Sequence, residues 1–166
     1  MSRRDQIRMS DEEAAEFLSH ERTVTCATIG REGWPHLMPL WYVLRDPGSG
    51  PAPRLWAWTY ATSQKVRNLE RDARATVQVE AGESYEELRG VMMECEVRLH
   101  RELDVVTELG LAIFKRYSTP RGQPPVHELH PEVAATIERQ AGKRVGLEFV
   151  ERRRATWDHR KLGGVY

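Results

Sequence analysis

A cluster of polar and basic residues begins at Thr62, in the stretch TSQKVRNLER, directly after the apolar run RLWAWTY. A helix that starts at Thr62 or Ser63 leaves backbone N–H groups unpaired in its first turn, and its dipole favours negative charge there. Lys65 lies within that turn. These residues could bind a small anion such as a phosphate. They could also form an ordinary helix cap with a solvated basic face, and the stretch alone leaves both interpretations open.

Large aromatic residues occupy the two apolar runs before this stretch. Such residues more often pack in cores and interfaces than bind a ligand. Pro35 and Pro39 interrupt the first run, and proline within a sheet belongs at an edge, a strand start or a bulge. An irregular edge beside aromatic rings would suit a flat ligand. The aromatic residues are Trp34, Trp41, Tyr42, Trp56, Trp58 and Tyr60.

Other catalytic patterns are weak. His127 and His130 lie three residues apart in VHELHP, but the HExxH pattern is absent and Pro131 follows, so they are expected at the start of a helix. No GxSxG motif frames a serine nucleophile. Cys26 and Cys95 lie in strand-like runs without metal-ligand spacing and are expected to be reduced core thiols. We expect no metal site.

The elements that must position these residues follow from the apolar periodicity. Ser10 and Glu13 have capping-box spacing at the start of a first helix. Further helices are expected over 62–71, 102–118 and 130–142, the last one ended by Gly142. The Pro/Gly-rich segment 45–53 is expected to be a loop. Seven strand-like runs, spaced as hairpins, predict a mostly antiparallel barrel with helical additions. These runs are 22–30, 34–44, 54–60, 74–80, 89–100, 143–151 and 153–159.

Length and charge restrict the possible functions. The 166 residues suggest one domain, residues 1–166. Because Lys plus Arg and Asp plus Glu both total 25, the chain lacks the cationic excess of a nucleic-acid-binding protein. Basic residues concentrate in 65–74 and 143–161, two segments that could meet in the fold. No signal peptide or membrane span is recognisable, which favours a cytoplasmic location and no membrane partner.

The segments GWPHLMPLWY and TYATSQKVRNLERD, within a match from about Asp11 to Leu99, together resemble the split-barrel flavin and deazaflavin oxidoreductases, the superfamily of pyridoxamine 5'-phosphate oxidase-like proteins. The resemblance implies a six-stranded antiparallel split β-barrel of the FMN-binding type. It also implies a homodimer with the cofactor in a cleft between the subunits. Two departures stand out. Ala73 replaces a proline that is common in the family, and the carboxyl-terminal pattern of true pyridoxamine 5'-phosphate oxidases is absent, so that substrate is not expected.

The resemblance also assigns roles to individual residues. Those implied to line the cofactor ring are His36, Leu37, Pro39 and Trp41. Those implied to hold the ribityl-phosphate end are Thr59, Ser63, Gln64, Lys65 and Asn68. The composition of the tail suggests a further role for Trp157 and Lys161. They either bind the cofactor, in their own subunit or in the partner subunit, or belong to a last strand and a frayed terminus.

The flavin or deazaflavin would supply the hydride chemistry, so no catalytic triad is expected. Coenzyme F420 carries a lactyl-oligoglutamate tail beyond its phosphate. The extra cations Arg67, Arg71 and Arg74 and the basic carboxyl-terminal segment favour F420 over FMN. The expected reaction is hydride transfer between F420 and a small organic substrate, with His36 as a possible proton donor. The alternatives are an FMN-dependent oxidoreductase of the same superfamily, a protein that binds flavin or haem without turnover, and a dimeric scaffold without cofactor.

Overall fold

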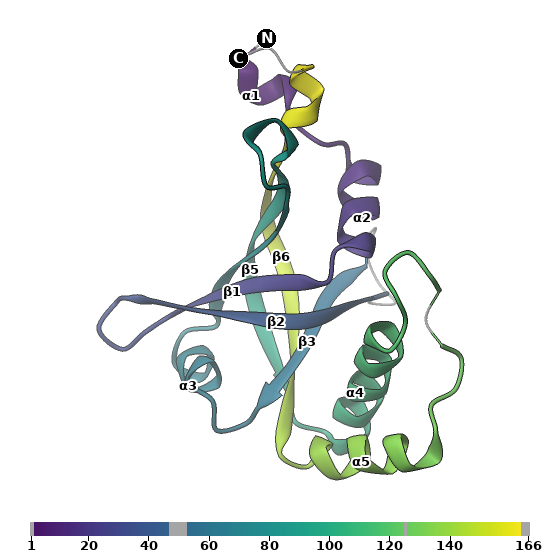
Figure 1. Ribbon diagram of the computed structural model, residues 1–166. Coiled ribbons are helices and arrows are strands. Elements are labelled where there is room, and N and C mark those ends of the chain that lie inside the picture. The colour runs from purple at the N-terminus through teal and green to yellow at the C-terminus, as the bar shows by residue number, and fades with distance from the viewer. Residues whose placement is uncertain (1, 47–52, 125, 164–166) are drawn as a thin grey trace.

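Six antiparallel strands close into a barrel in the computed structural model, which describes residues 2–46, 53–124 and 126–163. The strand order around the barrel is β1-β2-β3-β6-β5-β4 (Figure 1). Neighbouring strands pair antiparallel throughout, as the hairpin spacing predicts. The strands are β1 Thr23–Ile29, β2 Pro35–Arg45, β3 Arg54–Tyr60, β4 Arg74–Ala81, β5 Arg89–His100 and β6 Arg144–Asp158.

The expectation of seven strands is wrong in one respect, because the last two predicted runs form the single strand β6. Opposite it, Glu94 pairs with Arg153 and the next residue, Cys95, pairs with Glu151. One extra residue, Arg152, is thus accommodated as a bulge. A bulge bends a strand without ending it, whereas the charged run ERRR in the sequence suggests a break. The predicted loop 45–53 lies largely outside the described residues.

Helices pack around the barrel (Figure 1): two precede the first strand, and three more lie between strands further along the chain. Helix α2 has the predicted capping box, with Ser10 Oγ accepting from Glu13 N at 3.2 Å and Glu13 Oε2 accepting from Ser10 N at 2.7 Å. His130 immediately precedes α5, and Gly142 ends it, as expected. The helices are α1 Arg3–Gln6, α2 Asp11–His20, α3 Gln64–Arg71, α4 Leu103–Tyr117 and α5 Pro131–Ala141, with short 3₁₀ segments η1 Tyr85–Glu87 and η2 His159–Leu162.

The barrel interior is the main hydrophobic core, filled by the inward-facing residues of the strands and by Phe17 and Leu18 of α2. Cys26 and Cys95 are both free and buried in it. Burial raises the pKa of each thiol to about 12, so both remain protonated at neutral pH. The prediction of core thiols is confirmed.

A second core joins α4 and α5 to the outer side of β2 and β3, and Trp58 is its largest member. Gly110 of α4 makes room for that ring, because a Cβ at this position would lie 2.5 Å from Trp58 Cζ3. The two helices therefore pack against the end of β3, and the TSQK stretch follows that end in the sequence (Figure 1).

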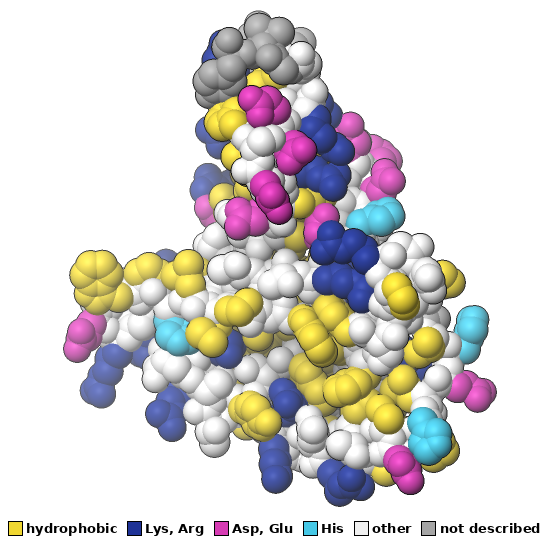
Figure 2. Space-filling view, viewed as in Figure 1, with side chains coloured by type: hydrophobic (Ala, Val, Ile, Leu, Met, Phe, Trp, Pro, Cys, Tyr) yellow, Lys and Arg dark blue, Asp and Glu magenta, His cyan; other side chains and the backbone are white. Residues whose placement is uncertain are grey.

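Strand β2 exposes apolar side chains along much of its length. The exposed fractions are 56% for Leu37, 41% for Met38 and 53% for Trp41, and Trp34 at the hairpin turn is 77% exposed. Figure 2 shows hydrophobic side chains along the β1–β2 hairpin and again on the lower half of the same face. A patch of this kind on a monomer marks an interaction surface. Among the described residues, no helix is long and apolar enough to cross a membrane.

Candidate functional site

The start of α3 is held close to the end of β3 by a tight turn. Ser63 N donates to Tyr60 O at 3.0 Å, and Ser63 is the residue that precedes the helix, in extended conformation. Of the two predicted caps it is therefore Ser63, not Thr62, that occupies the position. Its hydroxyl makes no capping hydrogen bond, and Ser63 Oγ is buried without a partner among the described residues. A buried hydroxyl of this kind is available to a ligand.

Lys65 is buried although it carries a charge, with only 7% of its surface exposed. Its Nζ donates to Thr59 Oγ1 at 3.1 Å. Burial lowers the pKa of Lys65, and in the described parts of the chain no carboxylate forms an ion pair with it. A buried ammonium group bonded only to a neutral hydroxyl needs a counter-charge, and a bound anion would supply it.

Asn68 is fully buried and fixes α3 on the barrel. Its Nδ2 donates to Thr28 Oγ1 at 3.0 Å, and its Oδ1 accepts from Gln64 Nε2 at 2.9 Å. Both ends of the Asn68 amide thus already have partners within the protein. Asn68 thus ties α3, the helix that carries Lys65, to β1, and Gln64 orients the Asn68 amide.

Four of the predicted residues line one pocket of about 550 Å³, which we call the Lys65 pocket. They come from two strands and a helix that are far apart in sequence but meet at one end of the barrel. Aromatic side chains and two cations surround the space. The lining residues are Thr23, Pro39, Leu40, Trp41, Trp58, Thr59, Lys65, Phe114, Gln140 and Arg144.

Trp41 presents a flat aromatic surface to this pocket. One face of its ring stacks on Tyr117, with centroids 4.5 Å apart and planes 14° apart. Tyr117 is fixed in turn, since its hydroxyl donates to Arg22 O at 2.5 Å and accepts from Tyr42 N at 2.9 Å. Because Trp41 remains 53% exposed, its ring can stack on a planar ligand.

His36 and Leu37 lie further along β2 and do not line the Lys65 pocket. Leu37 is exposed and shares a strand face with Pro39 and Trp41. His36 is half-buried opposite Thr28 in the register, and its Nδ1 is buried without a partner among the described residues. Leu37 therefore extends the candidate surface along the hairpin, whereas His36, the neighbouring residue on the strand, points to the opposite face.

Trp157 and Lys161 are not brought to the Lys65 pocket within this chain. The Trp157 ring covers Gly90, where a Cβ would lie 2.3 Å from Trp157 Cζ2. Lys161 Nζ donates to Arg8 O at 2.8 Å and to Glu13 Oε2 at 2.5 Å. This region lies at the opposite end of the molecule from α3 (Figure 1).

The structure adds Arg144, Gln140 and Phe114 to the pocket, none of which the sequence analysis singled out. Arg144 is the first residue of β6 and pairs in register with Tyr60. It belongs to the basic segment 143–161. The two basic segments therefore come together as expected, since Lys65 and Arg144 line the same pocket. The sequence feature that could have pointed to Arg144 is a cation at the start of a predicted strand that pairs with the aromatic end of another strand.

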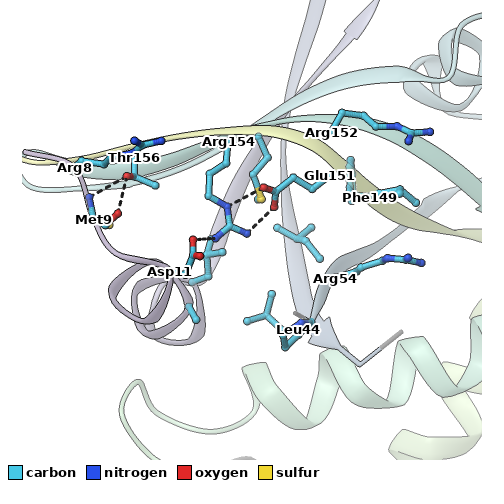
Figure 3. A pocket seen from close by; sticks show the side chains of 16 residues that line it. Arg8, Met9, Asp11, Leu44, Arg54, Phe149, Glu151, Arg152, Arg154 and Thr156 are labelled. Carbon is cyan, nitrogen blue, oxygen red and sulfur yellow. Dashed lines mark hydrogen bonds and ion pairs between the residues drawn. The ribbon is translucent and has the colours of Figure 1, made fainter. Parts of the chain in front are cut away.

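A second pocket, of about 520 Å³, lies between α2 and the strands β5 and β6, and we call it the Arg154 pocket (Figure 3). Three of the arginines that line it are paired with carboxylates. Arg154 Nε and Nη2 donate to Glu151 at 3.0 and 2.6 Å, Arg152 pairs with Glu96, and Arg54 pairs with Glu148. These cations are largely neutralised by the protein itself. In the described part of the chain, no cluster of His, Cys, Asp or Glu could hold a metal ion.

The closed six-stranded antiparallel barrel is the fold of split-barrel proteins. The family model described as pyridoxamine 5'-phosphate oxidase matches residues 10–140. The chain therefore belongs to this family, and the resemblance read from the sequence is confirmed. Comparison with curated proteins gives no match.

Solved structures support the same fold. The conserved hypothetical protein Rv2991 of Mycobacterium tuberculosis is 36% identical, with a TM-score of 0.82, over 100% of this chain and 95% of that one. An F420 reductase is 16% identical, with a TM-score of 0.61, over 88% and 98% of the two chains. HutZ, a haem storage protein of Vibrio cholerae, is 12% identical, with a TM-score of 0.62, over 86% and 90%. The last two likenesses establish the fold alone.

Proposed function

We propose that this protein is an oxidoreductase that binds coenzyme F420 in the Lys65 pocket and exchanges hydride between the deazaflavin and a small organic substrate. The observation that carries the proposal is Lys65, a buried cation without a carboxylate partner among the described residues. It lines the same pocket as Trp41, whose ring has one open face. A phosphate joined to a planar ring system satisfies both features.

Different residues bind the phosphate and the ring of the cofactor. Lys65 and the free hydroxyl of Ser63 bind the phosphate, and Thr59 holds the Lys65 ammonium group in place. Pro39 and Trp41 support the ring. When bound, the deazaflavin supplies the hydride-transfer chemistry. His36, whose Nδ1 is without a partner in the described chain, is the candidate proton donor.

The preference for F420 over FMN rests on charge beyond the phosphate site. Arg74 contributes little to it, because it is paired with Asp72 at 2.7 Å, and Arg71 donates to Ile29 O. Arg67 is exposed on α3, and Arg144 supplies a second cation inside the pocket. FMN shares the phosphate and is the alternative cofactor.

We also propose that the protein is a homodimer with the cofactor between the subunits. The exposed side chains of Leu37, Met38 and Trp41 on β2 provide an apolar surface beside the pocket. A second copy that covers this surface would close the open side of the pocket and exclude water from the ring. In that arrangement Trp157 and Lys161 belong to the partner's site, or to neither.

Titration of the purified protein with F420 and, separately, FMN tests the proposed function, with tryptophan quenching as the readout. Each compound is paired with its form that lacks the phosphate. We expect F420 to bind more tightly than FMN and each phosphate-free form to bind much more weakly. Tighter FMN binding would assign the protein to FMN chemistry, and the absence of binding by all four compounds would refute a cofactor site here.

A further inference from the structure

Arg144 is rigidly placed at the junction between α5 and β6. The turn after Gly142 is pinned to the barrel because Ala61 N donates to Lys143 O at 3.0 Å. The next residue is Arg144, which pairs with Tyr60 across the β3–β6 ladder. Its side chain lines the Lys65 pocket, together with Gln140 of α5.

Two aromatic rings hold the guanidinium group. Arg144 Cζ lies 4.4 Å from the centroid of Trp58 and 4.2 Å from that of Tyr60. Trp58 is itself packed tightly over Gly110. Stacking on aromatic rings leaves the N–H groups at the edge of a guanidinium free to point at a ligand. It also reduces the side-chain entropy that is lost when a ligand binds.

The hydrogen-bonding capacity of Arg144 is mostly unused. Nη2 donates to Gln140 Oε1 at 3.2 Å, while Nε is buried without a partner among the described residues. No carboxylate of the described chain pairs with Arg144, in contrast to Arg54, Arg154 and Arg160. An arginine that is stacked, fixed and unpaired inside a pocket is suited to bind a planar or tetrahedral oxyanion with two parallel hydrogen bonds.

We propose that Arg144 is a second anion-binding residue of the Lys65 pocket and that the bound molecule carries two oxyanion groups. Lys65 takes one of them, a phosphate, and Arg144 takes the other, a carboxylate or a second phosphate. The inference rests on the proposed function for the identity of the first group. The second group belongs either to the tail of the cofactor or to an acidic substrate, and its oxyanion chemistry is the same in both cases.

Gln140 is a positioning residue in this arrangement. Its Oε1 holds one edge of the guanidinium, and its side-chain amide lies at the pocket wall. An oxyanion bound to Arg144 would either replace the hydrogen bond to Gln140 Oε1 or form beside it. Gln140, which is neutral, would therefore modulate the affinity of Arg144 for the oxyanion.

The test compares Arg144→Met and Arg144→Lys with the wild-type protein and with Arg153→Met. Arg153 is on the same strand but is exposed and paired with Glu94, so it controls for loss of one positive charge. Arg144→Lys keeps the charge but lacks the fork of two N–H donors. Thermal unfolding of every variant establishes that each one is folded.

Three compounds distinguish the sources of the second anion: F420, the same deazaflavin truncated after its phosphate, and succinate added to protein saturated with the truncated compound. If the cofactor tail supplies the anion, Arg144→Met should lower the affinity for F420 by about tenfold or more. The affinity for the truncated compound should then stay the same. If an acidic substrate supplies it, Arg144→Met should abolish succinate binding instead. In both cases Arg144→Lys should lie between Arg144→Met and the wild type, and Arg153→Met should match the wild type.

Wild-type affinity of Arg144→Met for F420 and for succinate would overturn the inference. If the wild-type protein binds neither deazaflavin, the proposed function fails instead. Succinate and inorganic phosphate, titrated into the unloaded wild-type and Arg144→Met proteins, then decide the role of Arg144 alone. Equal binding by the two proteins, or none, would refute that role.

Discussion

The Lys65 pocket and the Arg154 pocket have nearly the same volume, about 550 and 520 Å³, and both are lined by cations and apolar side chains. They differ in what the cations contact. Arg154 is held by Glu151, and by Asp11 at 3.9 Å (Figure 3), whereas Lys65 and Arg144 have only neutral partners in the described chain. The presence of positive charge therefore does not mark a ligand site, but a buried positive charge that the protein leaves uncompensated does.

The largest expected effect is the loss of cofactor binding on removal of Lys65. Lys65→Met keeps the apolar stem and removes the charge that faces the phosphate. We expect cofactor affinity to fall by roughly 100-fold, on the order of 3 kcal/mol, because a buried charge-assisted contact is lost. Fluorescence titration measures it. Arg154→Met is the matched control in the other pocket, and an equal loss of affinity there would erase the distinction between the two pockets.

Trp41→Ala should have a smaller effect on binding. It removes the ring that is stacked on Tyr117 and open toward the pocket. Stacking on an aromatic side chain contributes about 1 kcal/mol, so we expect about a fivefold loss of affinity for the cofactor and for its phosphate-free form alike. Isothermal calorimetry with both compounds checks this. If Trp41→Ala weakens only the phosphorylated compound, the ring does not lie on Trp41.

Stability should change in opposite directions in the two pockets. Lys65→Met should raise the free energy of unfolding of the ligand-free protein by about 1 kcal/mol, since it removes a buried charge without a counter-charge. Arg154→Met should lower it by about 1 kcal/mol, because Glu151 and Asp11 lose their partner. Urea denaturation of both variants without ligand tests the pair. A destabilised Lys65→Met protein would mean that an internal group already compensates Lys65.

The stability difference between wild type and Lys65→Met should also depend on pH. Burial lowers the pKa of Lys65 in the folded protein below its usual value of 10.5, so the unfolded chain binds this proton more tightly. The cost of the buried charge is fully present below the folded pKa and is relieved as pH rises toward 10.5. We therefore expect the difference between the two proteins to shrink between neutral and alkaline pH in urea denaturation. A constant difference would contradict the lowered pKa.

Much of the fold and part of the site could be predicted from the sequence. The strand periodicity, the capping box at Ser10 and the TSQK stretch are local signals, and the elements they predict form as expected. The number of strands could not be predicted, because the last two predicted runs form one strand. The bulge at Arg152 depends on the pairing partner in β5, which a single run of residues does not reveal.

Arg144 illustrates what local patterns miss in a binding site. Its importance comes from Trp58, Tyr60 and Gln140, which are brought together only when β6 pairs with β3 and α5 packs beside them. Conversely, the sequence left open whether Trp157 and Lys161 bind a cofactor in their own subunit or in a partner, and this chain places them far from its own Lys65 pocket (Figure 1). Those two roles stay predictions.

The central claim is that Lys65 is a buried cation that awaits an anionic ligand, and its pKa measures this most directly. The chemical shift of the Lys65 side chain can be followed by NMR with isotope-labelled lysine, and its signal is assigned by comparison with Lys65→Met. The titration is carried out as pH is raised, without ligand and with F420 or FMN. The account predicts a pKa below 10.5 in the free protein and an increase on binding, because the phosphate stabilises the charged form. A pKa that stays the same when the cofactor binds would contradict the assignment of Lys65 to the phosphate.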